Sequence, residues 1–130
     1  MQGKLWIGTD GGGINVFENG KRTAIYNKEN GKLMSNSVLC SLKDSENNLW
    51  FGTYLGNISH YNKQSGEFKT IELEKGKLLD IRTFYEDQEK NIWIGTHKGI
   101  YVFSLSKKKV VKHYNTLNCQ LPENLVRSIA

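Results

Sequence analysis

The chain has 130 residues, of which 38% are hydrophobic and 24% are charged, and its formal net charge is +5. This composition is typical of a globular protein of one ordinary domain's length and excludes a disordered chain. The sequence has no apolar run near the roughly 20 residues that span a bilayer, and its basic residues are scattered. We therefore expect neither membrane insertion nor nucleic-acid binding.

One five-residue motif occurs three times, at residues 5–9, 49–53 and 92–96. Each copy has a tryptophan at its second position and ends in Gly-Thr, and the tryptophans stand at positions 6, 50 and 93. Two variable residues, a glycine and a short strand-like run ending on an aromatic residue follow each copy. Self-similarity at a period of about 20 to 50 residues is the signature of a repeat architecture.

The first unit is predicted to run from about residue 4 to about residue 27 as three strands. Residues 4–9 alternate in side-chain direction, as a strand does, and Asp10-Gly11-Gly12-Gly13 supplies the glycines of a tight turn. Two further strands follow, over about 13–17 and 22–27, joined by a polar turn at 18–21. The unit therefore reads as an antiparallel meander.

The second and third units repeat this pattern with one more strand each. The second covers about 37–72, with strands at 37–43, 49–53, 57–61 and 67–72. The third covers about 80–114, with strands at 80–86, 91–96, 99–104 and 109–114. The tail, 124–130, is predicted to form one more opening strand, of the innermost type that the first unit lacks.

These units predict an all-β fold, a segment of a β-propeller with three four-stranded antiparallel blades and twelve strands, circularly offset along the chain. Propellers close with about four to eight blades, so three blades leave two apolar sheet faces uncovered. Three arrangements remain open: completion by further blades of a parent protein, a dimer that closes a six-bladed ring, or an open stack.

The repeat is similar to the two-component regulator propeller repeat. The likeness rests on an opening Val or Ile, an Asp before a polar turn, Leu-Trp-Ile-Gly-Thr, and a glycine three residues later. The resemblance implies a piece of the periplasmic sensor region of a bacterial hybrid histidine kinase, with the kinase itself outside these residues. It further implies binding of an extracellular ligand, a carbohydrate breakdown product, or support for the blades that bind one.

Most conspicuous side chains have structural interpretations. A tryptophan that recurs at the repeat period is expected to pack between blades. Asp44 and Asp87 open polar turns and are expected to cap the backbone amides of those turns rather than to bind calcium. The three histidines occupy unrelated positions of the repeat. No serine or cysteine is followed or preceded by a base at a spacing typical of a nucleophilic catalytic site. We therefore expect no catalytic residue, cofactor or metal.

Candidate ligand-binding residues lie at the positions that differ between the repeats, because loops on a rigid scaffold are free to vary in sequence. The variable positions after Gly-Thr include Asp10, Tyr54 and His97, and the position after the opening Val or Ile includes Arg82 and Arg127. These loops should share one face, which could bind a polar ligand such as a glycan fragment. The alternatives are a solvated loop face or a protein-interaction scaffold that binds no small molecule.

Overall fold

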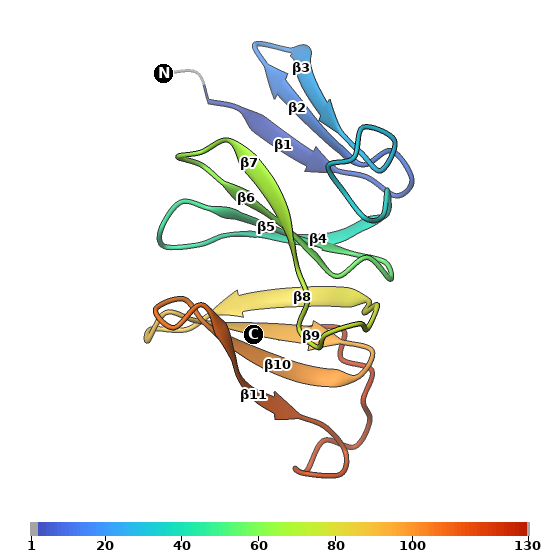
Figure 1. Ribbon diagram of the computed structural model, residues 1–130, viewed down its shortest axis with the longest axis vertical. Helices are drawn as coiled ribbons and strands as arrows, with labels where there is room; N and C mark the ends of the chain where they lie inside the picture. The colour runs from blue at the N-terminus through green and yellow to red at the C-terminus, as the bar shows by residue number, and fades with distance from the viewer. Residues whose placement is uncertain (1–2, 130) are drawn as a thin grey trace.

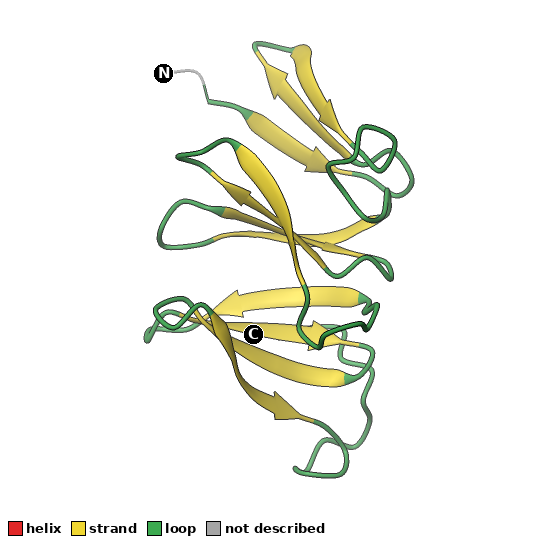
Figure 2. Cartoon of the chain, viewed as in Figure 1, coloured by secondary structure: helices red, strands yellow, loops and turns green. Residues whose placement is uncertain are grey.

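The computed structural model describes residues 3–129, which form eleven β-strands in three antiparallel sheets (Figures 1 and 2). The first sheet has the order β1-β2-β3, with strands Leu5–Gly8, Ile14–Glu18 and Lys21–Tyr26. The second has the order β4-β5-β6-β7, with strands Val38–Lys43, Leu49–Thr53, Ile58–Asn62 and Glu67–Ile71. The third runs β8 to β11, with strands Ile81–Glu86, Asn91–Thr96, Gly99–Ser104 and Lys109–Tyr114. None of the described residues forms a helix long and apolar enough to cross a membrane.

The three sheets stack face to face in chain order (Figure 1), and each junction is made at the glycine of the repeated motif. A Cβ atom added to Gly52 would lie 2.5 Å from Cγ2 of Ile81, the residue that opens the third sheet. Gly8 makes the same close approach to Val38, which opens the second sheet. Only a residue without a side chain allows the opening residue of the next sheet to come this near.

The tryptophans of the first two motifs pack toward the next sheet. Trp6 contacts Phe51 of the second sheet with ring centroids 6.1 Å apart, and Trp50 contacts Phe103 of the third with ring centroids 5.2 Å apart. Trp50 is 1% exposed and belongs to the larger core, which lies between the second and third sheets. The interpretation of the tryptophans as packing residues between sheets is confirmed for Trp6 and Trp50.

The aspartates that open the polar turns hold both the turn and the indole. One carboxylate oxygen of Asp44 accepts hydrogen bonds from the backbone N–H groups of Glu46 and Asn48, each at 2.9 Å. The other accepts from Nε1 of Trp50 at 2.8 Å. Asp87 repeats these bonds, with 2.9 Å to Nε1 of Trp93. The predicted capping role is confirmed, and the bond to the indole adds to it.

The glycine turn of the third unit is one residue shorter than the others. The hydroxyl of Thr96 donates to the carbonyl of Gly99, whereas Thr53 donates to that of Asn57. Both Gly99 and Asn57 have positive φ, at 99° and 61°. Gly99 is therefore equivalent to Asn57 and not to Gly56, although Gly56 and Gly99 each stand three residues after the threonine of their motif.

The tail does not form the predicted twelfth strand within the described residues 124–129, and Ala130 lies outside them. Its N–H at Val126 donates to the carbonyl of Thr96 at 2.9 Å, as Val38 donates to Thr9 at 2.8 Å. The tail thus enters the next position of the stack. Val38 continues into strand β4 because β5 pairs with it, and in the described part of the chain no strand follows the tail to pair with it.

Both ends of the stack present apolar side chains to solvent. On the first sheet, Leu5 and Ile7 point away from Trp6, which packs on the second sheet, and Leu5 is 61% exposed. On the third sheet, Tyr85 is 43% exposed and lies across from Trp93, whose ring stacks on Tyr114 at 5.9 Å. The two end faces are different surfaces, so contact between them would be head to tail.

Substituting Gly52→Ala should lower the free energy of unfolding by about 1–3 kcal/mol, because the added methyl overlaps Ile81 and the Sγ of Cys40. Urea denaturation followed by tryptophan fluorescence measures this change. Gly3→Ala is the matched control, since nothing lies within 4 Å of a Cβ at that position. Equal effects of the two substitutions would contradict the close-approach argument.

The isolated chain is expected to self-associate through its end faces, with a dimer closing a six-bladed ring as the predicted form. Light scattering during size exclusion, at several concentrations, measures the mass. Leu5→Lys should weaken the association, whereas Gln88→Lys, which adds the same charge in the exposed turn between β8 and β9, should not. A monomer at every concentration would contradict the prediction.

Candidate functional site

The loops that follow the Gly-Thr dipeptides and the loops that enter β4 and β8 gather at one end of the stack, the right-hand side in Figure 1. We call this end the loop face. It includes the predicted residues Asp10, Tyr54 and His97. The polar turns opened by Asp44 and Asp87 lie at the opposite end.

A buried carboxylate, Asp80, organises the centre of the loop face. Asp80 is 6% exposed and lies in the loop between β7 and β8. One of its oxygens accepts a hydrogen bond from the N–H of Leu55 at 2.9 Å, and the other pairs with Nη2 of Arg82 at 2.9 Å. Its own N–H donates to Nδ1 of His97 at 3.1 Å. Asp80 therefore joins Arg82 and His97 to the Tyr54–Leu55 turn of the neighbouring sheet.

The network leaves hydrogen-bond donors on the loop face. Because His97 accepts at Nδ1, its neutral ring carries the proton on Nε2. Nε of Arg82 is buried without a hydrogen-bond partner among the described residues, but the Arg82 side chain as a whole is 29% exposed, so other guanidinium N–H groups can reach a ligand. The Tyr54 side chain is 49% exposed. A guanidinium, an imidazole N–H and a phenol are groups that can bind hydroxyl or carboxylate oxygens.

Asp10 lies beside the same turn but is linked to it by a serine. The hydroxyl of Ser37 donates to Asp10 at 2.8 Å, and the Ser37 carbonyl accepts from the N–H of Tyr54 at 3.0 Å. Arg127 is exposed in the tail, and no hydrogen bond within the described residues joins it to the Asp80 network. The structure thus brings together Arg82, His97 and the turn that carries Tyr54, places Asp10 next to them, and leaves Arg127 apart.

Sequence reasoning missed Ser37 and Asp80, which occupy the same repeat position. Each immediately precedes the opening residue of its sheet, Val38 or Ile81. The third copy of the position is Leu125, which cannot accept or donate through its side chain. Two of the three repeats carry a polar residue at this position. Aligning the residue that precedes the opening Val or Ile in each repeat would have identified Ser37 and Asp80 as candidates.

Contacts with Tyr101 attach the loop that carries Asp80 to the third sheet. Glu74 accepts a hydrogen bond from the hydroxyl of Tyr101, and the His113 ring stacks on Tyr101 with centroids 3.8 Å apart. The bond from Tyr101 holds the pKa of the Glu74 carboxyl below its ordinary value. Burial, together with that bond, raises the pKa of Tyr101. The β7–β8 loop is therefore fixed to the third sheet.

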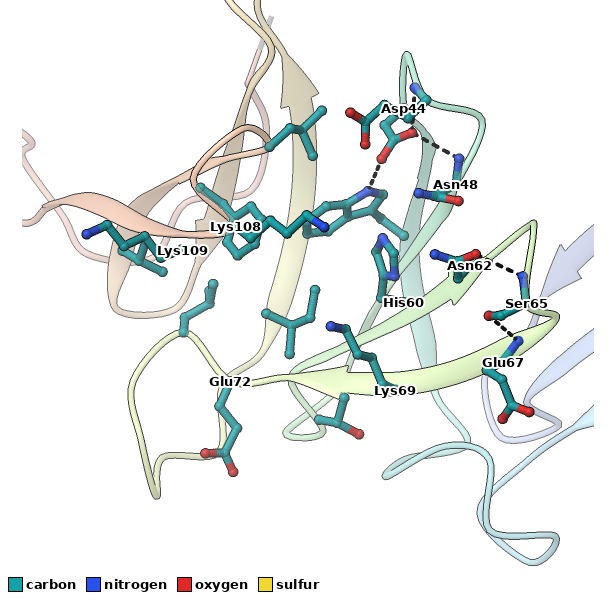
Figure 3. A pocket seen from close by; sticks show the side chains of 18 of the residues that line it. Asp44, Asn48, His60, Asn62, Ser65, Glu67, Lys69, Glu72, Lys108 and Lys109 are labelled. Atoms are coloured by element: carbon teal, nitrogen blue, oxygen red, sulfur yellow. Dashed lines mark hydrogen bonds between the residues drawn. The ribbon is translucent and has the colours of Figure 1, made fainter.

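A hollow lies elsewhere, between β6 and β7 of the second sheet and the β10–β11 turn of the third (Figure 3). Its volume is about 870 Å³, and its lining includes Trp50, His60, Phe103 and Lys108. None of the five predicted ligand-binding residues lines it.

The chain matches a family model described as two component regulator propeller, over residues 32–55 and 77–98. These two ranges contain Ser37, Tyr54, Asp80, Arg82 and His97, so the network of the loop face lies within the matched repeats. None of the curated proteins compared with the chain matches it.

Solved structures resemble the chain over nearly its whole length. It is 71% identical, with a TM-score of 0.89 over 98% of the chain, to the extracellular domain of the hybrid two component system BT3049 from B. thetaiotaomicron, and it spans 17% of that protein's chain. The extracellular domain of the hybrid two component system BT4673 from the same organism is 23% identical, with a TM-score of 0.70, over 88% of this chain and 17% of that one. PorZ of Porphyromonas gingivalis is 14% identical, with a TM-score of 0.60, over 88% of this chain and 17% of that one. The last two likenesses concern the fold alone, and together with the first they confirm the predicted β-propeller segment.

Substituting Asp80→Ala should lower the free energy of unfolding by about 1–3 kcal/mol, because it leaves the N–H of Leu55 and the guanidinium of Arg82 without their acceptor. Urea denaturation measures the loss. Asp10→Ala removes a carboxylate with one exposed hydrogen bond and should change stability by less than about 0.5 kcal/mol. Comparable losses would show that Asp80 does not organise the loop face.

Tyr101→Phe should destabilise the protein most at neutral pH and progressively less in acid. The folded-state pKa of Glu74 is lowered, so its bond contributes stability above the ordinary carboxyl pKa and loses it as pH falls through the folded value. Urea midpoints of both proteins between about pH 7 and about pH 3 test this. Tyr85→Phe, on an exposed ring, is the control. A difference that stays constant or grows in acid would contradict the assignment.

Proposed function

The chain carries two-component regulator propeller repeats, and on that premise we propose that it is a ligand-sensing segment of the extracellular domain of a hybrid two-component system. Its location would then be extracellular or periplasmic, in line with the two B. thetaiotaomicron domains that it resembles. Further blades of a longer protein would cover its end faces. The observation that carries the proposal is the Asp80 network, which gathers Arg82, His97 and the Tyr54 turn on one face.

The ligand we propose is a carbohydrate fragment. A sugar offers many hydroxyl oxygens, which the guanidinium of Arg82 and Nε2 of His97 can bind, and an apolar ring face, which a half-exposed phenol such as Tyr54 can cover. The groups come from two adjacent sheets. A ligand that bridges them would bind best in one packing of those sheets and would shift the population toward it.

The second candidate function is an interaction scaffold that binds no small molecule. The exposed apolar side chains at the two ends of the stack, Leu5 and Tyr85 among them, favour it. In this case the loop face would be a solvated surface, and the end faces would carry the whole function.

Binding of neutral and acidic oligosaccharides on a glycan array, followed by calorimetry with the best fragment, tests the proposal. The Tyr54→Ala, Arg82→Ala double variant should weaken that binding by at least about tenfold, a loss of about 1.4 kcal/mol. Tyr54→Ala alone leaves the Asp80–Arg82 ion pair intact and should show part of the loss. Gln88→Ala with Glu89→Ala, in an exposed turn at the opposite end, is the matched control. Undiminished binding by the double variant would remove these residues from the site, and no binding by the wild type would favour the scaffold.

A further inference from the structure

The hollow between the second and third sheets has a specific origin in the repeat. At the junction of the first two sheets the corresponding space is filled by rings. Tyr26 stacks on Trp6 with centroids 5.8 Å apart, and its centroid lies 4.7 Å from that of Phe68. The centroid of Tyr61 lies 4.7 Å from that of Trp6 and 6.4 Å from that of Tyr26. The first junction is therefore closed by four aromatic side chains.

The strand registers show which residues replace these rings at the second junction. Tyr26 pairs across the first sheet with Ile14, and the equivalent pair in the second sheet is Ile58 with Ile71. In the second sheet Phe68 pairs with Tyr61. Phe103 occupies the position of Tyr61 in the third sheet, and its partner there is Val110, which therefore replaces Phe68. Two aromatic rings are thus replaced by aliphatic side chains, Ile71 and Val110, and both line the hollow of about 870 Å³.

A histidine stands where the other two sheets have valine. The residue paired with the motif tryptophan is Val16 in the first sheet, Val102 in the third and His60 in the second. The His60 ring meets Trp50 edge to face, with centroids 4.9 Å apart. Its Nδ1 is buried and has no hydrogen-bond partner among the described residues. Burial lowers the pKa of His60, so at neutral pH the ring is uncharged and can donate or accept.

Two ammonium groups enter the hollow from opposite sides. Lys69 is the cross-strand partner of His60 on β7, and Lys108 lies in the β10–β11 turn. Both side chains point into the hollow, whereas the carboxylates of Glu67 and Glu72 point away from it (Figure 3). Neither lysine belongs to a salt bridge within the described residues. The carboxylate oxygens of Asp44 are occupied by the indole and by backbone amides.

We propose that this hollow binds a small organic carboxylate with an apolar body. The carboxylate lies between Lys69 and Lys108, and His60 supplies a hydrogen bond beside it. The apolar body covers the aliphatic floor, which includes Ile71 and Val110. The lining of the hollow includes none of Asp10, Tyr54, Asp80, Arg82 and His97, so the site does not depend on the proposed carbohydrate site.

Titration with 3-phenylpropionate, followed by ¹H–¹⁵N spectra of the indole groups, tests the proposal. The indole signal of Trp50 should shift saturably, while that of Trp93, which faces away from the hollow, should stay in place and report the fold. 3-Phenylpropionamide, which has the same body without the charge, should bind at least about tenfold more weakly. No saturable shift with the carboxylate, or equal binding of the amide, would overturn the proposal.

Matched variants assign the binding to this hollow. Lys108→Ala should weaken phenylpropionate binding by at least about threefold, whereas Lys107→Ala, in the same exposed turn but outside the lining of the hollow, should not. Ile71→Tyr with Val110→Phe restores the aromatic residues of the first junction and should abolish binding while the Trp93 signal is retained. The Tyr54→Ala, Arg82→Ala variant should bind as the wild type does, which separates this site from the loop face. Equal binding by Lys108→Ala and Lys107→Ala would overturn the assignment.

Discussion

The stack depends on one close approach, between the glycine of each Trp-x-Gly-Thr motif and the first residue of the next sheet. At Gly52 a methyl group would already overlap Ile81, so the distance between sheets is set by the absence of a side chain. The contact also fixes what precedes Ile81 in the chain. Asp80 is carried over the Tyr54–Leu55 turn and comes within hydrogen-bond distance of Leu55. The polar network of the loop face therefore follows from an apolar contact beneath it.

The second and third sheets each contain a hydrogen bond between the motif tryptophan and the aspartate that opens the polar turn. Burying an indole N–H without an acceptor costs free energy, and Asp44 and Asp87 supply the acceptor from within the same sheet. The second and third sheets therefore satisfy the indole N–H of their motif tryptophan with a side chain of the same sheet. The side chains that meet between sheets are then free to be apolar, aromatic or, at His60, polar.

The strands and the packing role of the tryptophans could be predicted because both follow from local sequence patterns, and the same pattern occurs in three repeats. The role of Asp80 could not be predicted in the same way, because its partners Leu55 and His97 come from two different sheets. The likeness of the tail, 124–130, to β4 predicts a strand, but pairing needs a neighbour as well as a pattern. The hollow arises from Ile71 and Val110 together, and neither substitution is conspicuous alone.

The departures from the repeat concentrate at the junction of the second and third sheets. At the loop end, Asp80 replaces serine and forms an ion pair with Arg82. In the hollow, aliphatic side chains replace rings and His60 replaces valine. The glycine contact at Gly52 and the Trp50–Asp44 bond are both retained there, so the fold is held by positions that do not vary. Because those contacts keep the sheets together, the remaining positions of this junction can carry polar groups and unfilled volume, which the ring-filled first junction cannot.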